Sequence, residues 1–208
     1  MPISHRLKLI FIHISKTGGS SIEKMLNLFP DSFHAFNPEM MIGIDRDGYV
    51  LQALPLYNYG KYYSKEIIDT YFKFTVVRNP YDRCISDYSE NNRGYECFET
   101  YLRFVKHTLE THSTDQLLKY NRKYYTHHWL PQVTLIGDVS NFDMVLKFEN
   151  LSDDIKTLST KIGTELMLPH IGASKRNHDY HVYYTDTTRA LVNDIYHDDF
   201  VQFGYSFE

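Results

Sequence analysis

Short apolar runs alternate with stretches of helical spacing along this chain. Residues 7–14 (LKLIFIHI) form a run too short for a typical helix, which predicts a buried strand. Residues 71–77 (YFKFTVV) are a second β-rich run that ends at Arg78-Asn79-Pro80, and a third strand is expected at about residues 144–148. The irregular residues 31–63, where prolines and glycines are scattered, predict loops and short pieces.

Helical patterns follow the predicted strands. Apolar spacing predicts a helix over residues 21–28, which Pro30 ends, and Pro80 suits the first turn of a second helix that runs to about residue 91. Further helical spacing covers residues 97–125, 151–162 and 187–197. This alternation predicts an α/β fold: a P-loop-like central, mostly parallel sheet flanked by helices, with ligands at the carboxyl ends of the strands. The length of 208 residues predicts a single domain over residues 1–208.

The charge balance argues against a nucleic-acid partner. The formal net charge is -4, and no run of Lys or Arg is long enough to form a basic stripe. The densest positive segment consists of Lys119, Arg122, Lys123, His127 and His128. We expect this segment to be a solvated helix face, with a patch on the acceptor side of a site as the alternative.

The cysteine count and hydropathy bear on the surroundings of the protein. Cys84 and Cys97 lack CxxC spacing, so they predict neither a disulfide framework nor a metal site, and they suit a reducing compartment. No apolar run approaches the roughly 20 residues that span a bilayer. We therefore expect a soluble, cytoplasmic protein, or a Golgi-lumenal one if an N-terminal anchor has been removed. The oligomeric state does not follow from the sequence.

A glycine- and hydroxyl-rich segment joins the first strand to the first helix. In residues 15–21 (SKTGGSS), the glycines let backbone N–H groups approach an anion, and Lys16 adds a mobile positive charge. Thr17, Ser20 and Ser21 can donate hydrogen bonds to phosphate or sulfate oxygens. The lysine precedes the glycines, unlike the GxxxxGK[ST] pattern, and no acidic strand end offers a clear magnesium ligand, so a magnesium-dependent kinase is disfavoured.

The second strand leads into another candidate phosphate site. Arg78 ends that strand and Ser86 lies eight residues later on the next helix, so both can face one phosphate. Arg83 lies on the same segment. We expect it to form a helix-surface ion pair with Asp82 or Asp87 rather than to bind a ligand.

Together these segments resemble the carbohydrate-type sulfotransferases that use 3′-phosphoadenosine 5′-phosphosulfate (PAPS). HISKTGGSS looks like their 5′-phosphosulfate motif, and VVRNPYDRCISDY looks like their 3′-phosphate motif. The segments HWLPQ, KFENL, LPH and DDFVQFGYSF also resemble this family, so the likeness spans nearly the whole chain. It implies the same fold and PAPS as the sulfuryl donor, with no metal.

Carried over by position, the resemblance assigns residues to the donor. Those implied to hold the 5′-phosphosulfate are Lys16, Thr17, Gly18, Gly19, Ser20 and Ser21. Arg78 and Ser86 are implied to bind the 3′-phosphate. In related enzymes a basic stretch closes over the nucleotide, and Ser174-Lys175-Arg176 is its nearest match here, with an ordinary exposed loop as the alternative.

The resemblance leaves the general base open. Family members often carry a His about two dozen residues before the 3′-phosphate arginine, in a segment like LQH, whereas this chain has Leu51-Gln52-Ala53. Our candidate for the base is His34; alternatively the acceptor is an amine or an acidic hydroxyl that needs less help. The candidates for the acceptor cleft are His127, His128 and Trp129.

The expected reaction is sulfuryl transfer from PAPS to a hydroxyl or amine of a carbohydrate or small-molecule acceptor. Lys16 is expected to be catalytic as well, because its charge stabilises the leaving oxygen. His13 and Glu149 are expected to be structural: His13 packs or orients the loop, and Glu149 anchors a loop or helix start. The alternatives are a P-loop nucleotide kinase or NTPase and, because of Ala53, a non-catalytic 3′-phosphonucleotide-binding module.

Overall fold

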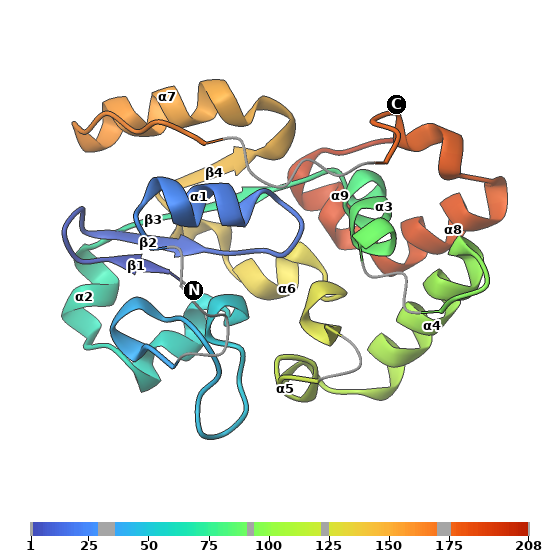
Figure 1. Cartoon of the computed structure of the whole chain (residues 1–208), viewed down its shortest axis with the longest axis horizontal. Coiled ribbons are helices and arrows are strands. Elements are labelled where there is room, and N and C mark those ends of the chain that lie inside the picture. Colours follow the sequence, from blue (N-terminus) through green and yellow to red (C-terminus); the bar gives the residue numbers. More distant parts are fainter. Residues whose placement is uncertain (1, 29–35, 91–93, 122–124, 170–175, 208) are drawn as a thin grey trace.

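A four-stranded sheet forms the centre of the computed structural model, which describes residues 2–28, 36–90, 94–121, 125–169 and 176–207 (Figure 1). The strands lie in the order β1 (Ile3–Ser4), β2 (Leu9–Ile12), β3 (Phe72–Val77) and β4 (Met144–Lys147). Strands β2, β3 and β4 run parallel, and β1 pairs antiparallel with β2. The α/β class with a mostly parallel sheet is thus confirmed. Strand β1 was not predicted, because two residues are too few to show a period.

Helices cover both faces of this sheet (Figure 1). Their bounds are α1 (Gly19–Met25), α2 (Lys65–Thr70), α3 (Pro80–Glu90), α4 (Phe98–Thr111), α5 (Thr114–Leu117), α6 (Gln132–Ile136), α7 (Leu151–Ile162), α8 (Asp186–Ile195) and α9 (His197–Phe203). In Figure 1, α1 and α7 lie on one side of the sheet and α2 and α6 on the other. No helix in the described ranges is both long and apolar enough to cross a membrane.

Alternation along the strands divides the apolar side chains between the two faces. Leu9 and Phe11 of β2 pack with α1 and α7 in one core cluster. Ile10 and Ile12 of the same strand join a second cluster, which includes Leu135 of α6. The sheet is therefore buried on both faces, as expected for parallel strands.

A third core cluster is rich in aromatic side chains and lies between α3, α4 and α8. Its buried members include Tyr81, Tyr101, Trp129 and Tyr196. Many of the chain's tyrosines are therefore core residues, which hold α3 in place at the end of β3.

The parallel order fixes where the candidate site forms. Strands β2, β3 and β4 are neighbours and point the same way, so their carboxyl ends meet at one edge of the sheet. The SKTGGSS segment follows β2, Arg78 follows β3, and Phe148 follows β4. Segments far apart in sequence are thereby brought to one edge.

Candidate functional site

A cavity of about 780 Å³ lies at this edge of the sheet. It is lined by residues from each parallel strand's exit, among them Lys16, Arg78 and Phe148. Of the residues predicted for the donor, Gly18, Gly19, Ser20, Ser21, Ser86 and Arg176 also line it. The two predicted phosphate-binding segments therefore share one cavity.

Residues 15–21, which we call the glycine turn, have a backbone that depends on glycine. Gly18 precedes α1 with φ of 83°, in the left-handed region that glycine adopts without strain. At Gly19, a Cβ would lie 2.0 Å from Nε2 of His13, which is too close for any side chain. His13 in turn contacts Glu23 through Nδ1 at 2.6 Å. The expected role of His13 in packing and orienting this turn is confirmed.

The polar side chains of the glycine turn divide into two groups. Thr17 is buried, and its hydroxyl donates to the carbonyl oxygen of Ile14 at 2.7 Å, so this side chain holds the turn and only its backbone N–H remains for an anion. Lys16, Ser20 and Ser21 line the cavity. The ammonium group of Lys16 is paired with the carboxylate of Glu90.

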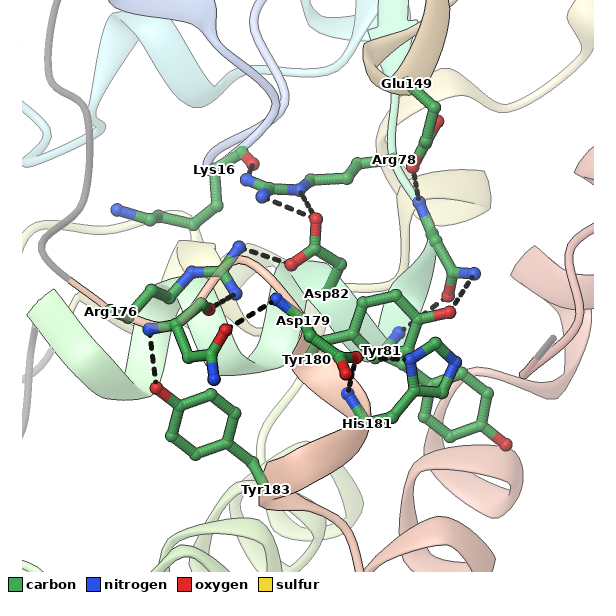
Figure 2. A network of polar contacts seen from close by, with 12 residues as sticks. Lys16, Arg78, Tyr81, Asp82, Glu149, Arg176, Asp179, Tyr180, His181 and Tyr183 are labelled. Carbon is green, nitrogen blue, oxygen red and sulfur yellow. Dashed lines mark hydrogen bonds and ion pairs between the residues drawn. The ribbon is translucent and has the colours of Figure 1, made fainter.

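One face of α3 and the residues just before it runs along the cavity. Arg78, Asp82, Ser86 and Glu90 recur every four residues and all line the cavity; we call them the cavity stripe. Nε and Nη2 of Arg78 donate to Oδ2 of Asp82 at 2.9 and 2.6 Å. Nη1 of Arg78 donates to the carbonyl oxygen of Lys16 at 2.8 Å. Arg78 therefore ties α3 to the glycine turn (Figure 2).

Burial and the neighbouring charge shift the pKa of Arg78 in opposite directions. Its side chain is 8% exposed, and the guanidinium lies 3.9 Å from the centre of the Phe148 ring. Burial lowers the pKa of Arg78, while the neighbouring carboxylate of Asp82 opposes that shift. The guanidinium remains charged because its ordinary pKa is so high.

A second arginine reaches the same carboxylate from a distant part of the chain. Nη2 of Arg176 donates to Oδ1 of Asp82, so Asp82 lies between the two guanidinium groups (Figure 2). Arg176 also lines the cavity. Its predicted partner Lys175 lies outside the described residues, as does His34, the predicted base.

Glu149 anchors the loop between β3 and α3. Its Oε1 accepts from the backbone N–H of Asn79 at 2.7 Å, and its Oε2 accepts from the hydroxyl of Tyr205 at 2.9 Å. The expectation that this carboxylate is structural is confirmed. It fixes the residue that directly follows Arg78.

Arg83 is buried, so the prediction of a helix-surface ion pair is wrong. Its side chain donates to three backbone carbonyl oxygens, those of Ser15 at 3.1 Å, His128 at 2.7 Å and Leu130 at 3.0 Å. The reason is the turn of α3: Arg83 faces the protein interior, where these carbonyls need donors. It joins the glycine turn to the HWLPQ segment.

The two histidines of the densest positive segment, His127 and His128, do not lie on a solvated helix face, in contrast to our expectation. His127 is buried and His128 is partly buried, and both line the cavity. Trp129 is buried behind them and donates its indole N–H to Asp87 at 3.2 Å, which supports the cavity wall. Lys119 is partly exposed near Asp115, and Arg122 and Lys123 lie outside the described residues.

Asp87 is a central residue that the sequence analysis gave only a minor part. Besides Trp129, it accepts from the hydroxyl of Tyr101 at 2.8 Å and contacts Nδ1 of His128 at 2.7 Å. Burial alone raises the pKa of Asp87, but the attraction and hydrogen bond of His128, with that of Tyr101, outweigh burial and hold it below its ordinary value. The sequence feature that could have identified Asp87 is its position one helical turn after Arg83.

The segment that carries Ala53 also reaches the cavity. Val50, Gln52 and Ala53 line it, although Ala53 offers no group that titrates. The Oε1 of Gln52 accepts from the backbone of Gly43 at 3.2 Å, and its Nε2 is buried without a partner among the described residues. This part of the cavity wall thus combines apolar and amide groups.

Comparison with known proteins identifies a family for this arrangement. Searches of curated proteins and of solved structures found no match to the chain. The model of one protein family, described as "Sulfotransferase family", matches residues 1–206. With nearly its whole length matched, the chain belongs to this sulfotransferase family.

Proposed function

We propose that this protein transfers a sulfuryl group from PAPS to a hydroxyl group of an uncharged carbohydrate or small-molecule acceptor. One observation carries the proposal: the glycine turn and the Arg78–Ser86 unit line the same cavity, and Nη1 of Arg78 is 2.8 Å from the carbonyl oxygen of Lys16. A nucleotide with phosphoryl groups at both 5′ and 3′ positions needs two anion sites in one cavity. Family membership supports the sulfuryl chemistry.

The donor is proposed to lie across the two units. The groups assigned to its 5′-phosphosulfate are the Lys16 ammonium, the backbone N–H groups of Thr17, Gly18 and Gly19, and the hydroxyls of Ser20 and Ser21. Arg78, Ser86 and Arg176 are assigned to the 3′-phosphate, because guanidinium groups bind such oxygens with paired hydrogen bonds. Lys16 must exchange Glu90 for the donor when it binds.

The reaction requires the protein to position donor and acceptor and to stabilise the charge on the leaving group. The acceptor oxygen bonds to sulfur as the bond between sulfur and the bridging phosphate oxygen breaks, and that oxygen leaves with the electron pair. Lys16 is placed to stabilise the charge that develops there, since such stabilisation is the main demand of this type of transfer.

The rest of the cavity wall indicates an uncharged acceptor. We call Val50, Gln52, Ala53, His127 and His128 the acceptor wall. The lysine and arginine side chains that line the described cavity are Lys16, Arg78 and Arg176, all assigned to the donor. A polyanionic acceptor would meet no further lysine or arginine among the described lining residues, whereas a sugar hydroxyl finds an amide and two imidazoles.

Ligand-induced stabilisation tests the donor site. A ligand present at 100 times its Kd raises the free energy of unfolding by about 2.7 kcal/mol if it binds only the folded state. We expect 3′-phosphoadenosine 5′-phosphate (PAP) to raise the melting temperature more than ADP or magnesium-ATP. Arg78→Ala should abolish this shift, whereas Arg103→Ala, at an exposed pair on α4, should keep it.

Transfer from labelled PAPS then tests the reaction. Product formed on neutral sugars or alcohols would support the proposal, and turnover confined to sulfated polysaccharides would contradict the acceptor class. Binding of PAP without turnover on any acceptor would favour the non-catalytic module. Selective stabilisation by magnesium-ATP would instead favour the kinase or NTPase.

A further inference from the structure

We propose that His128 is the general base of this enzyme and that Asp87 holds it in the required orientation and tautomer. The inference rests on the proposed function, since it supplies a proton acceptor for the hydroxyl that attacks PAPS. It also answers a specific difficulty, because position 53 carries an alanine on the acceptor wall.

The carboxylate behind His128 is built to hold an imidazole. Asp87 is 3% exposed and contacts Nδ1 of His128 at 2.7 Å. Tyr101 and Trp129 donate to its other oxygen at 2.8 and 3.2 Å, which keeps the carboxylate fixed. The low pKa of Asp87 agrees with an ionised carboxylate that is ready to stabilise an imidazolium.

Two aromatic neighbours and a carboxylate hold the ring of His128. Tyr125 stacks on it with ring centres 5.3 Å apart, and His127 packs edge-on with centres 4.6 Å apart. Arg83 holds its backbone carbonyl at 2.7 Å. Because Nδ1 faces Asp87, Nε2 is the nitrogen left for the cavity, and none of the described residues is hydrogen-bonded to it.

The other histidines of the cavity are less suited to this task. His127 is buried, and burial lowers its pKa well below the ordinary value, so it is a poor proton acceptor. His13 has its Nδ1 on Glu23 and its Nε2 packed against Gly19. His178 also lines the cavity, but it is exposed and no carboxylate among the described residues is paired with it. Among the described histidines of the cavity wall, His128 therefore combines a fixed carboxylate partner with an open ring nitrogen.

The proton and the sulfuryl group move in one balanced step. The acceptor O–H proton passes to Nε2 of His128 while the acceptor oxygen bonds to sulfur, and PAP leaves with the electron pair of the broken bond. Asp87 accepts the hydrogen bond from Nδ1–H throughout and stabilises the imidazolium. His128 then returns its proton to solvent.

His128→Ala tests the assignment. General-base catalysis contributes about 10²–10⁴-fold, so kcat should fall by a factor in that range while the KM for PAPS and the PAP-induced melting shift stay unchanged. Added imidazole should restore part of kcat, in proportion to its free-base fraction. His107→Ala, on the exposed face of α4, is the matched control and should keep full activity.

The pH profile separates a base from a structural residue. Wild-type kcat/KM should rise with pH on the acid side, and this rise should flatten in His128→Ala. Among the described residues, the titratable or charged groups that contact His128 are Asp87, Arg83, Tyr125 and His127, and Tyr101 and Lys16 act on Asp87. Asp87→Asn should lower kcat similarly because it destabilises the imidazolium. His128→Gln is a second variant at the base position: a loss of kcat in a His128→Gln protein of native stability is not a folding defect.

The outcomes distinguish this inference from the proposed function. Activity of His128→Ala within a few-fold of wild type, or a loss that imidazole does not rescue, would overturn the base assignment alone. A wild-type protein that transfers no sulfuryl group to any acceptor would overturn both.

Discussion

His127 shows at the scale of one residue how the cavity wall controls protonation. The side chain is buried, and its Nδ1 has no hydrogen-bond partner among the described residues. Burial lowers its pKa well below 6.5, the ordinary value, and neighbouring His128 adds to this effect. The folded protein therefore holds His127 as the neutral imidazole, which can exchange a hydrogen bond with a hydroxyl but carries no charge.

Replacing His127 with Gln should reduce the loss of stability in acid. Because its pKa is lower in the folded than in the unfolded state, the unfolded chain binds one more proton below pH 6.5. The stability due to neutral His127 is thus present above that pH and lost below it, at up to about 1.4 kcal/mol per pH unit. We would measure the free energy of unfolding by urea denaturation at several pH values between 5 and 8. As the pH falls, this free energy should decrease less steeply in His127→Gln than in wild type.

The exposed variant His107→Ala serves as the control for a general histidine effect. The pH dependence of its free energy of unfolding should match that of the wild type, because this substitution leaves the buried His127 in place. Equal slopes in wild type and His127→Gln would show that His127 accepts its proton in the folded state.

At the scale of elements, α3 links the residues that we propose for donor binding to those that we propose for acceptor activation. Its cavity stripe carries Arg78 and Ser86, whereas the adjacent face carries Arg83 and Asp87. This helix and the residues just before it thereby position Arg78, Ser86 and the carboxylate behind His128. A rotation of α3 would disturb both halves of the site together.

Glu90→Gln, at the end of this helix, should strengthen donor binding. Glu90 pairs with Lys16, and that pair must break before the ammonium contacts an anion. Because the Glu90 side chain is 68% exposed, water screens this pair as it does a surface ion pair, which is worth about 0.2–1 kcal/mol; the affinity for PAP should therefore rise by up to about fivefold. Calorimetric titration at low salt measures it, and the gain should shrink at high salt as charges are screened.

Glu99→Gln, which removes the carboxylate of an exposed pair on α4, is the control. It should leave PAP affinity unchanged because α4 contributes no residue to the cavity lining that the structure describes. Unchanged affinity in Glu90→Gln would mean that Lys16 does not need to leave Glu90 in order to bind the donor.

Periodicity predicted the long elements and missed the short ones. The β2, β3 and α7 segments follow apolar patterns of clear period, and α7 covers residues 151–162 as expected. Helix α6, with only five residues, was not predicted. The helix expected over residues 187–197 corresponds to α8, and α9 was not predicted as a separate helix. The expected helix over residues 97–125 is divided because Ser113 caps a new helix, α5, with a hydrogen bond to the backbone N–H of Gln116.

The sequence indicated the cavity residues of the glycine turn better than the contacts behind the acceptor wall. Glycines and a lysine between a strand and a helix have a local pattern, so the glycine turn could be found without tertiary contacts. Asp87 and His128 lie 41 positions apart and meet only through the fold, so neither the 2.7 Å contact nor the buried state of Arg83 had a local signal. The single-domain expectation stays a prediction.

At the scale of the whole molecule, the C-terminal segment helps to hold the site. The hydroxyl of Tyr205 donates to Glu149, which lies just after β4. Glu149 also accepts from the backbone N–H of Asn79, which lies just after β3. The side-chain amide of Asn79 donates to the carbonyl oxygen of Ser206 at 2.8 Å, which closes the connection. Three segments far apart in sequence thus fix the backbone beside Arg78.

Glu149→Ala should therefore weaken both stability and donor binding. Two hydrogen bonds are lost, each with a net worth of about 0.5–1.5 kcal/mol, so the free energy of unfolding should fall by about 1–3 kcal/mol. Asp153→Ala, at an exposed pair on α7, is the control and should change neither quantity. Urea unfolding and PAP titration measure the two effects separately. A Glu149→Ala protein that is less stable but binds PAP with native affinity would show that Arg78 keeps its position without this anchor, and that the Asp82 carboxylate suffices to hold its guanidinium.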